Sequence, residues 1–169
     1  MKKRVLTKMS NVKIVHNALS LTLLEVIQDY IKHGQIRHSY MDWGAEVIKE
    51  SNPVLIKDLN DNLSNRIITE LKLHLPEHTE IKCMWYGWIR GSYIPWHSDN
   101  NVKFGATLYL NNHWDEDWGG YFAYKEASEV KCIKPDFNKL TIIKPPVDHT
   151  VFNTTSNAPI RETIQIFGR

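Results

Sequence analysis

The sequence predicts a mainly β protein with supporting helices, arranged as a sandwich or jelly roll with helices packed on one sheet. Three observations lead to this prediction. The chain has 169 residues, enough for one hydrophobic core, and we expect a single domain over 1–169. Helical periodicity is confined to a support region at about 1–78. From about 80 to 169, short β-rich runs alternate with Gly, Pro, Asn and Asp, which is typical of strands joined by turns.

The first half begins with a strand and a helix. Val12 to Val15 is a short, mostly apolar run that we expect to form a strand. Ser20 can cap a helix running to about His33, because its hydroxyl can accept from a free backbone amide of the first turn. Gly34 then provides a stop. An apolar stripe repeats along this helix at Leu21, Leu24, Ile27 and Ile31.

A second helix is expected after a polar and aromatic loop over 35–50. Ser51, Asn52 and Pro53 are typical of a helix start, and Pro76 ends the helix. Its apolar positions include Val54, Leu55, Leu59, Leu63, Ile67, Ile68 and Leu71.

The second half contains eight candidate strands. They are 81–89, 93–97, 105–111, 121–124, 130–133, 140–144, 149–152 and 162–167. Two of these strands have one mainly polar face, because side chains two apart point the same way. The polar faces consist of Thr107, Tyr109 and Asn111, and of Arg161, Thr163, Gln165 and Phe167. Each could face solvent or line a barrel interior that holds a polar ligand, and periodicity leaves both open.

Composition narrows the class of protein and of site. Hydrophobic residues make up 42% and charged residues 24%, as in globular proteins, and 11% aromatic residues argue against a disordered chain. The two cysteines, Cys83 and Cys132, cannot form a disulfide scaffold or, alone, a four-thiolate zinc site. With eight His in the chain, any metal site would rest mainly on His and carboxylates.

Charge and hydropathy restrict the partners. A net charge of +2 argues against nucleic acid as a partner. No apolar run approaches the roughly 20 residues that span a bilayer, so we expect a cytoplasmic protein without signal peptide or membrane contact. The oligomeric state is left open. The beginning of the sequence is basic, with Lys2, Lys3, Arg4, Lys8 and Lys13. We expect these charges to be solvated or, alternatively, to attract an acidic partner.

Two His-x-Asp triplets could supply metal ligands: His97-Ser98-Asp99 and His113-Trp114-Asp115. In a strand, either triplet offers an imidazole and a carboxylate to one ion. With a distant His, such a pair makes the facial triad of non-haem Fe(II) oxygenases. We favour the first triplet, because His97 follows an apolar, aromatic strand. The second lies in a predicted hairpin connection, where Asp and Asn commonly bond to the backbone.

His149 is the favoured distant histidine, because it opens a predicted strand after the turn at Pro145-Pro146. Arg161 follows on the polar face of the last strand. Its guanidinium could hold a dicarboxylate through two parallel hydrogen bonds. The alternatives are a loop histidine and a surface arginine in an ion pair.

Together, His97-x-Asp99, His149 and Arg161 resemble the pattern of 2-oxoglutarate- and Fe(II)-dependent dioxygenases. Two further runs, Ala106-Thr107-Leu108-Tyr109-Leu110-Asn111 and Trp118-Gly119-Gly120, are similar to the prolyl 4-hydroxylase-like branch of that superfamily. The resemblance covers roughly 80–169. The interval between His149 and Arg161 is longer than the branch pattern, with a predicted loop insertion at 153–159.

This resemblance implies a double-stranded β-helix (jelly roll) with the N-terminal helices packed on one sheet. It implies a catalytic Fe(II) whose protein ligands are His97, Asp99 and His149. It also implies a 2-oxoglutarate site formed by Arg161 and Tyr109, with contributions from Thr163 and Tyr86.

The implied activity is hydroxylation with O2, coupled to oxidative decarboxylation of 2-oxoglutarate to succinate and CO2. Ascorbate is a candidate additional cofactor. The branch favours a prolyl or similar residue in a peptide or protein as substrate. The alternatives are hydroxylation of a free amino acid or other small molecule, and a non-catalytic jelly-roll binding module. Weaker substrate candidates beside the metal strand, which could equally serve packing, are Trp96, Trp88 and Arg90.

Overall fold

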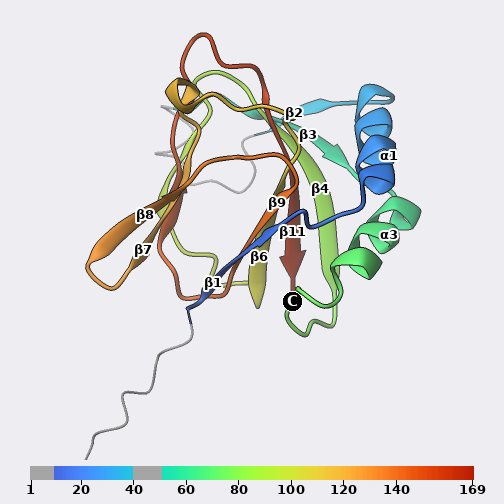
Figure 1. Ribbon diagram of the computed structural model, residues 1–169, viewed down its shortest axis with the longest axis horizontal. Coiled ribbons are helices and arrows are strands. Elements are labelled where there is room, and N and C mark those ends of the chain that lie inside the picture. The colour runs from blue at the N-terminus through green and yellow to red at the C-terminus, as the bar shows by residue number, and fades with distance from the viewer. Residues whose placement is uncertain (1–9, 40–50) are drawn as a thin grey trace, which may run out of the picture.

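The computed structural model describes residues 10–39 and 51–169, which form two antiparallel sheets and two α-helices (Figure 1). In sheet order, the large sheet consists of β1 (Val12–His16), β9 (Lys139–Ile143), β6 (Phe104–Tyr109), β11 (Arg161–Gly168), β4 (Ile81–Trp88), β3 (Val54–Asp58) and β2 (Arg37–Ser39). The small sheet consists of β5 (Ile94–His97), β10 (His149–Val151), β7 (Phe122–Glu126) and β8 (Glu129–Ile133). The basic residues at positions 2–8 lie outside the described residues.

The prediction of a mainly β fold is confirmed. Every strand pairing in the described ranges is antiparallel. Each of the eight runs predicted after Glu80 contains a strand, with its ends shifted by a few residues. Turn-bounded runs of β-rich residues therefore located these strands well.

The first helix forms where the sequence predicts it. Helix α1 (Leu21–Lys32) is capped by Ser20, whose Oγ accepts a backbone hydrogen bond at 3.3 Å. The Glu70 carboxylate accepts from the amide and the hydroxyl of Ser20, both at 2.8 Å, which ties the end of the second helix to the start of the first.

No helix in the described ranges is long and apolar enough to cross a membrane.

The predicted second helix is wrong in its first part. Residues 54–58 form strand β3, and α3 (Asp61–Leu71) starts only after Asn60, whose side chain accepts a backbone hydrogen bond at 2.9 Å. Val54 and Ile56 are buried on one face of β3 while this strand pairs with β4. A nonlocal pairing thus overrides a spacing that also suits a helix.

The predicted loop over 35–50 is also partly wrong. Its residues Arg37–Ser39 form β2, an edge strand paired with β3. A strand of three residues is too short for its alternation to be detected. The part of the predicted loop at 40–50 lies outside the described residues.

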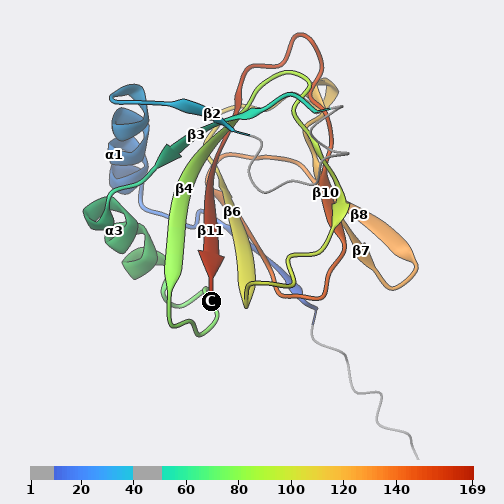
Figure 2. The same ribbon diagram turned by 180° about the vertical axis from the view of Figure 1, so that it is seen from behind.

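The outer face of the large sheet is apolar and shares one core with the helices. Figure 1 and Figure 2 both place α1 and α3 on one side of β4 and the small sheet on the other. Trp85, Ile164 and Ile166 of the sheet belong to a single buried cluster with the apolar side chains of both helices. The fully or nearly fully buried helix residues in that cluster are Leu23, Leu24, Ile27, Ile31, Leu63, Ile67 and Leu71.

The inner face of the large sheet carries buried polar side chains. Arg161 and Thr163 of β11 have no exposed surface. The polar face of the last strand therefore lines the barrel interior rather than facing solvent. A second buried apolar cluster with residues from both sheets includes Met84, Tyr86, Trp88, Tyr109, Phe122 and Tyr124.

Candidate metal centre

Three side chains that the sequence singles out as metal ligands come together beside the small sheet. His97 ends β5, His149 begins β10, and the two are directly paired across the ladder. Asp99 follows β5 by two residues. Ligand atoms of the three residues all lie within 4.8 Å of one another, and no other such group occurs in 10–39 and 51–169. The His97 Nε2–Asp99 Oδ1 distance is 3.7 Å, and His149 Nε2–Asp99 Oδ2 is 3.6 Å.

Backbone carbonyls orient both imidazoles. His97 Nδ1 lies 2.8 Å from the carbonyl oxygen of Pro95, and His149 Nδ1 lies 2.9 Å from that of Val147. A carbonyl oxygen can only accept, so each Nδ1 must carry the hydrogen and donate it. The lone pair of the neutral ring is then on Nε2, which faces Asp99. This is the arrangement of metal-binding histidines.

The electrostatics favour the protonation states that bind a metal. Burial lowers the pKa of His97, and the neighbouring His149 lowers it further. Burial alone would raise the pKa of Asp99, but the interactions with His149 and His97 outweigh it and lower the pKa. Neutral imidazole and ionised carboxylate are the forms that coordinate metal ions.

Strand β6 leaves room for the Asp99 carboxylate. A Cβ added at Gly105 would lie 3.3 Å from Asp99 Oδ2, which is a tight contact. Gly105 lies within a regular strand, paired with Phe167 and Ile143, so no turn requires a glycine there. A glycine inside a strand often marks a close approach of another group, which here is the carboxylate.

The three side chains open into a cavity of about 620 Å³ between the two sheets. Its walls include Tyr86, Trp88, Thr107, Phe122, Gln165 and Phe167. A second hollow, of about 670 Å³, lies away from this centre between α1 and the β2–β3 edge. Charged groups there already have partners: Arg37 forms an ion pair with Asp58 at 2.7 Å, and Lys57 donates to backbone oxygens of α1.

Directly paired residues on the inner face of the large sheet form a series of increasing depth. Opposite residues of antiparallel strands point to the same side, so each pair marks one level in the interior. From the metal centre inward, the levels are Gly105–Phe167, Thr107–Gln165, Tyr109–Thr163 and Trp88–Arg161.

Arg161 is a buried cation at the deepest of these levels. None of its three side-chain nitrogens has a hydrogen-bond partner, and it makes no ion pair within the described residues. Its guanidinium carbon lies 5.4 Å from the ring centre of Trp88, which lines the cavity, and 5.1 Å from that of Tyr109. Burial lowers the pKa of Arg161, although an arginine stays protonated near neutral pH. An unpaired buried cation is unfavourable, so the position suits an anionic ligand.

Two buried hydroxyl groups of the interior also lack hydrogen-bond partners: that of Tyr109, whose ring lies beside Arg161, and that of Thr141, a neighbour of Tyr109. Burial raises the pKa of Tyr109, and the neighbouring Arg161 and Thr141 oppose that rise. Thr141 is a site candidate that the sequence prediction missed. Its signal is a lone polar residue in the apolar run of β9, which has meaning only once β9 is known to face the interior.

Thr163 and Tyr86, the other predicted cosubstrate residues, lie at the level above Arg161. The hydroxyl of Thr163 accepts from Trp88 Nε1 at 3.3 Å and donates to the backbone oxygen of Tyr86 at 3.4 Å. Tyr86 and Trp88 line the cavity, whereas Thr163 is buried behind its wall.

Two predicted substrate residues lie elsewhere. Trp96 is 39% exposed, and Lys125 Nζ lies 4.9 Å from its ring centre. Arg90 is exposed beyond the end of β4, where its backbone oxygen accepts from the side chain of Asn52 at 2.8 Å. The structure brings neither residue into the cavity wall, and their substrate contacts stay predictions.

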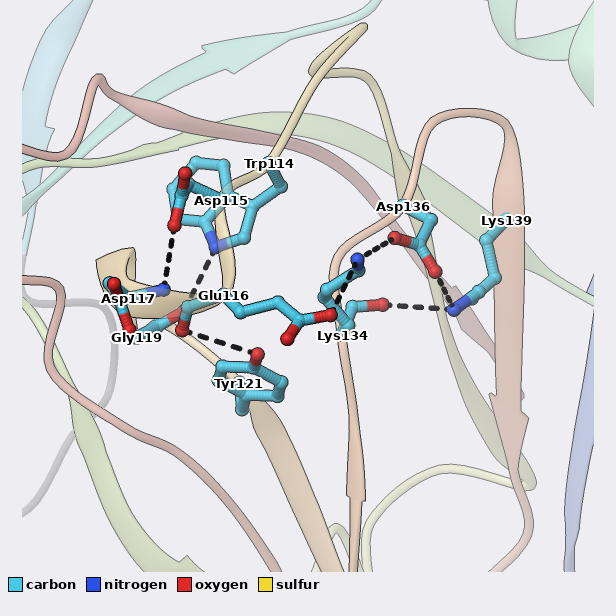
Figure 3. A network of polar contacts seen from close by, with 9 residues as sticks. All are labelled: Trp114, Asp115, Glu116, Asp117, Gly119, Tyr121, Lys134, Asp136 and Lys139. Atoms are coloured by element: carbon cyan, nitrogen blue, oxygen red, sulfur yellow. Dashed lines mark hydrogen bonds and ion pairs between the residues drawn. The ribbon is translucent and has the colours of Figure 1, made fainter.

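The second His-x-Asp triplet lies in the connection between β6 and β7 and serves the backbone. Asp115 caps the short 3-10 helix η1 (Glu116–Trp118), accepting a backbone hydrogen bond at 2.9 Å (Figure 3). The buried Trp114 donates to a backbone oxygen of the same turn at 2.9 Å. His113 is exposed, with its ring 5.5 Å from that of Trp118. No third ligand joins this triplet in the described residues.

The connection between β6 and β7 also covers the interior at the level of Arg161. Lys134 joins it to the following strands through ion pairs with Glu116 at 3.5 Å and Asp136 at 3.4 Å (Figure 3). Gly120 lies against the stem of Arg161, because a Cβ there would be 3.1 Å from Arg161 Cδ. The buried cation is thus shielded from solvent on this side.

Sequence comparison identifies a family for this architecture. A family model described as the 2OG-Fe(II) oxygenase superfamily matches residues 81–168, just over half of the chain. The matched segment includes the three clustered ligands and Arg161. A comparison with curated proteins finds no match.

Solved structures share the fold over nearly the whole chain. A prolyl-4-hydroxylase from Pseudomonas putida is 16% identical, with a TM-score of 0.71 and coverage of 95% of this chain and 94% of that chain. A prolyl hydroxylase from Trichoplax adhaerens, in complex with a hypoxia inducible factor peptide fragment, is 18% identical, with a TM-score of 0.73 and coverage of 95% and 84%.

A third similar structure holds a small molecule. HygX from Streptomyces hygroscopicus, with nickel, 2-oxoglutarate and hygromycin B bound, is 7% identical, with a TM-score of 0.66 and coverage of 94% and 83%. At these identities the likeness establishes the fold, and it confirms the predicted jelly roll.

Proposed function

The chain belongs to the 2OG-Fe(II) oxygenase superfamily, whose cofactors are Fe(II), 2-oxoglutarate and O2, and we propose that it hydroxylates a prolyl or similar residue in a peptide or protein. Hydroxylation would be coupled to oxidative decarboxylation of 2-oxoglutarate to succinate and CO2. One oxygen atom of O2 then enters the substrate and the other enters succinate. Ascorbate as an additional cofactor and a cytoplasmic location stay predictions.

The donor set of the metal centre fits Fe(II). Two imidazole Nε2 atoms and one carboxylate form the 2-His-1-carboxylate set that binds this ion on one face and leaves other positions open. His97, Asp99 and His149 would hold the ion. When bound, the iron and its cosubstrates supply an oxidation that protein side chains cannot perform.

The observation that carries the proposal is the unpaired Arg161 behind the wall of the same cavity. Its guanidinium can bind one carboxylate of a dicarboxylate in a bidentate manner, and the free hydroxyls of Tyr109 and Thr141 can add hydrogen bonds. A buried site strengthens such charge-assisted bonds, because water screens them less. The chain's own task is therefore to anchor one end of 2-oxoglutarate and to keep water away from that end.

The cavity walls support a prolyl substrate. The aromatic rings of Tyr86, Trp88, Phe122 and Phe167 provide flat apolar surfaces on which a pyrrolidine ring can pack. Two proteins with a similar fold are prolyl hydroxylases, one of them in complex with a peptide. A small-molecule hydroxylase is the second candidate, because the similar structure of HygX holds hygromycin B.

Turnover of 2-oxoglutarate tests the proposal. Purified protein with Fe(II), O2 and 2-oxoglutarate should form succinate slowly without a second substrate and faster with a proline-containing peptide that gains one oxygen by mass spectrometry. His113→Ala is a control that should keep this activity. A gain of oxygen by small molecules alone would favour the second candidate. A folded protein that binds neither Fe(II) nor 2-oxoglutarate would instead be a non-catalytic binding module.

A further inference from the structure

Gln165 is a polar side chain of the cavity wall that is hydrogen-bonded at both ends of its amide. It lies on the inner face of β11 and is 9% exposed. Its Oε1 accepts from the hydroxyl of Thr107 at 2.9 Å, and its Nε2 donates to the hydroxyl of Thr163 at 3.1 Å. Two threonines on neighbouring positions thus hold a buried amide in one conformation.

The hydroxyl of Thr163 fixes which end of the amide faces it. This hydroxyl has one hydrogen, and it donates that hydrogen to the backbone oxygen of Tyr86. It must therefore accept from Gln165, so the amide nitrogen faces Thr163 and the amide oxygen faces Thr107. The reverse orientation of the amide would place two acceptors, the Gln165 oxygen and the Thr163 oxygen, against each other.

This orientation leaves one hydrogen of Gln165 free. An amide nitrogen carries two hydrogens, and only one of them is donated to Thr163. No group in 10–39 or 51–169 accepts the other hydrogen. Because Gln165 lines the cavity, that hydrogen is available to a ligand in it.

The position of Gln165 identifies the part of a ligand that it can reach. The level of Gly105 and Phe167 lies beside the metal ligands, because a Cβ added at Gly105 would be 3.3 Å from the carboxylate of Asp99. Gln165 is at the next level inward, and Arg161 lies two levels deeper. A molecule that reaches from the metal centre toward Arg161 therefore passes Gln165 with its metal-proximal half.

We propose that Gln165 binds the 2-oxo acid end of 2-oxoglutarate, donating its free amide hydrogen to an oxygen of that end. This inference rests on the proposed function, in which the metal centre and Arg161 bind the two ends of the cosubstrate. Gln165 would then distinguish a 2-oxo acid from a dicarboxylate that lacks this group. Thr107 and Thr163 act through Gln165 by holding its amide in the binding orientation.

Anaerobic calorimetric titrations of Fe(II)-loaded protein with 2-oxoglutarate and with succinate test the inference. Gln165→Leu should weaken 2-oxoglutarate binding about 10- to 100-fold, the effect of losing a hydrogen bond to a charged group. Gln165→Glu, nearly isosteric, should weaken it at least as much, because a carboxylate would face the carboxylate of the ligand. Succinate, which has no 2-oxo group, should bind the Leu variant within about twofold of the unmodified protein.

Ile166→Val, on the opposite face of the same strand, is the matched control. Ile166 is buried in the cluster shared with the helices and does not line the cavity, so 2-oxoglutarate should bind within about twofold of the unmodified protein. The melting temperature of each metal-free variant reports its folding, and the Glu variant serves if the Leu variant does not fold.

Two results would overturn the inference. One is unchanged 2-oxoglutarate affinity in the folded Gln165 variants, and the other is an equal loss of 2-oxoglutarate and succinate. Both leave the proposed function intact if the unmodified protein binds Fe(II) and 2-oxoglutarate. If the unmodified protein binds neither, the proposed function and this inference fall together.

Discussion

The two His-x-Asp triplets are alike in sequence and opposite in structure. His97 and Asp99 turn toward the barrel interior, where His149 joins them within 4.8 Å. His113 stays exposed, while Asp115 accepts a backbone hydrogen bond in the connection between β6 and β7. One triplet forms part of a candidate metal centre, and the other shapes a turn.

The surroundings of each triplet explain this difference. The first triplet begins at the end of a strand whose ladder partner is His149, so a third ligand is brought alongside by strand pairing. The second lies in a connection between strands, and its carboxylate already accepts a hydrogen bond from the backbone. A metal-ligand motif therefore predicts a site only when its strand and the strand beside it are both known.

The largest contrast is expected in metal affinity. Asp99→Ala removes one of three ligands and should lower the Fe(II) affinity more than about 100-fold. That loss exceeds the one typical for a residue that only hydrogen-bonds to a metal ligand. Asp115→Ala should leave the affinity within about twofold. Anaerobic equilibrium dialysis measures both. Loss of Fe(II) binding in the Asp115 variant together with retained binding in the Asp99 variant would contradict the assignment of the metal centre to the first triplet.

Arg161→Met should separate ligand binding from stability. Loss of a bidentate, charge-assisted contact should weaken 2-oxoglutarate binding to the Fe(II)-loaded protein at least about 100-fold. The ligand-free protein should be as stable as the unmodified protein or more stable, by up to about 4 kcal/mol, because an unpaired buried charge has been removed.

Anaerobic titration and chemical denaturation measure the two effects of Arg161→Met. A variant that unfolds more easily yet binds 2-oxoglutarate normally would make Arg161 a structural residue.

Gly105→Ala tests the space beside Asp99. The added Cβ would displace the carboxylate by a few tenths of an ångström, which should lower the Fe(II) affinity on the order of 10-fold. The metal-free protein should melt at the same temperature or higher, since alanine restricts the unfolded chain more than glycine does.

Ala106→Gly, on the opposite face of the same strand, is the control for Gly105→Ala. It should lower the melting temperature and leave Fe(II) affinity unchanged, because Ala106 belongs to the cluster shared with the helices. Equal Fe(II) affinity in the Gly105 variant and the unmodified protein would remove the proposed constraint on Asp99.

The smallest effect is expected for the second triplet itself. Asp115→Ala should lower the free energy of unfolding by about 1 kcal/mol, the usual loss when a capping side chain is removed. Asp115→Asn keeps the accepting Oδ1 and should cost less. Denaturant titration compares the two variants. Equal losses would indicate that the charge of Asp115, rather than its cap, stabilises the turn.

The strands of the second half could be predicted from sequence because each is short, β-rich and bounded by turn residues. The error at 54–58 has a physical cause. Val54 and Ile56 fit both a helical stripe and an inward-facing strand, and only pairing with the distant β4 decides between them. Whether the polar face of β11 is buried likewise depends on the small sheet that covers it.

The residues of the candidate site likewise divide into those that could be predicted from the sequence and those that could not. His97, Asp99, His149, Tyr109 and Arg161 could be proposed from spacing and resemblance, and the structure brings them into one interior. Thr141 could not, because a polar residue in an apolar run becomes a ligand candidate only when its strand is known to line a cavity. Gln165 could be placed on the polar face of the last strand, but the sequence left open whether that face lines the interior. Their unpartnered groups, the Thr141 hydroxyl and the free amide hydrogen of Gln165, become visible only in three dimensions.

The most direct test of the metal centre is an anomalous-scattering map of crystals grown without oxygen in the presence of Fe(II) and 2-oxoglutarate. The predicted result is one iron peak between the Nε2 atoms of His97 and His149 and the carboxylate of Asp99, with the far carboxylate of 2-oxoglutarate against Arg161. An iron peak at His113 and Asp115, or no peak beside Asp99 in a folded protein, would contradict it.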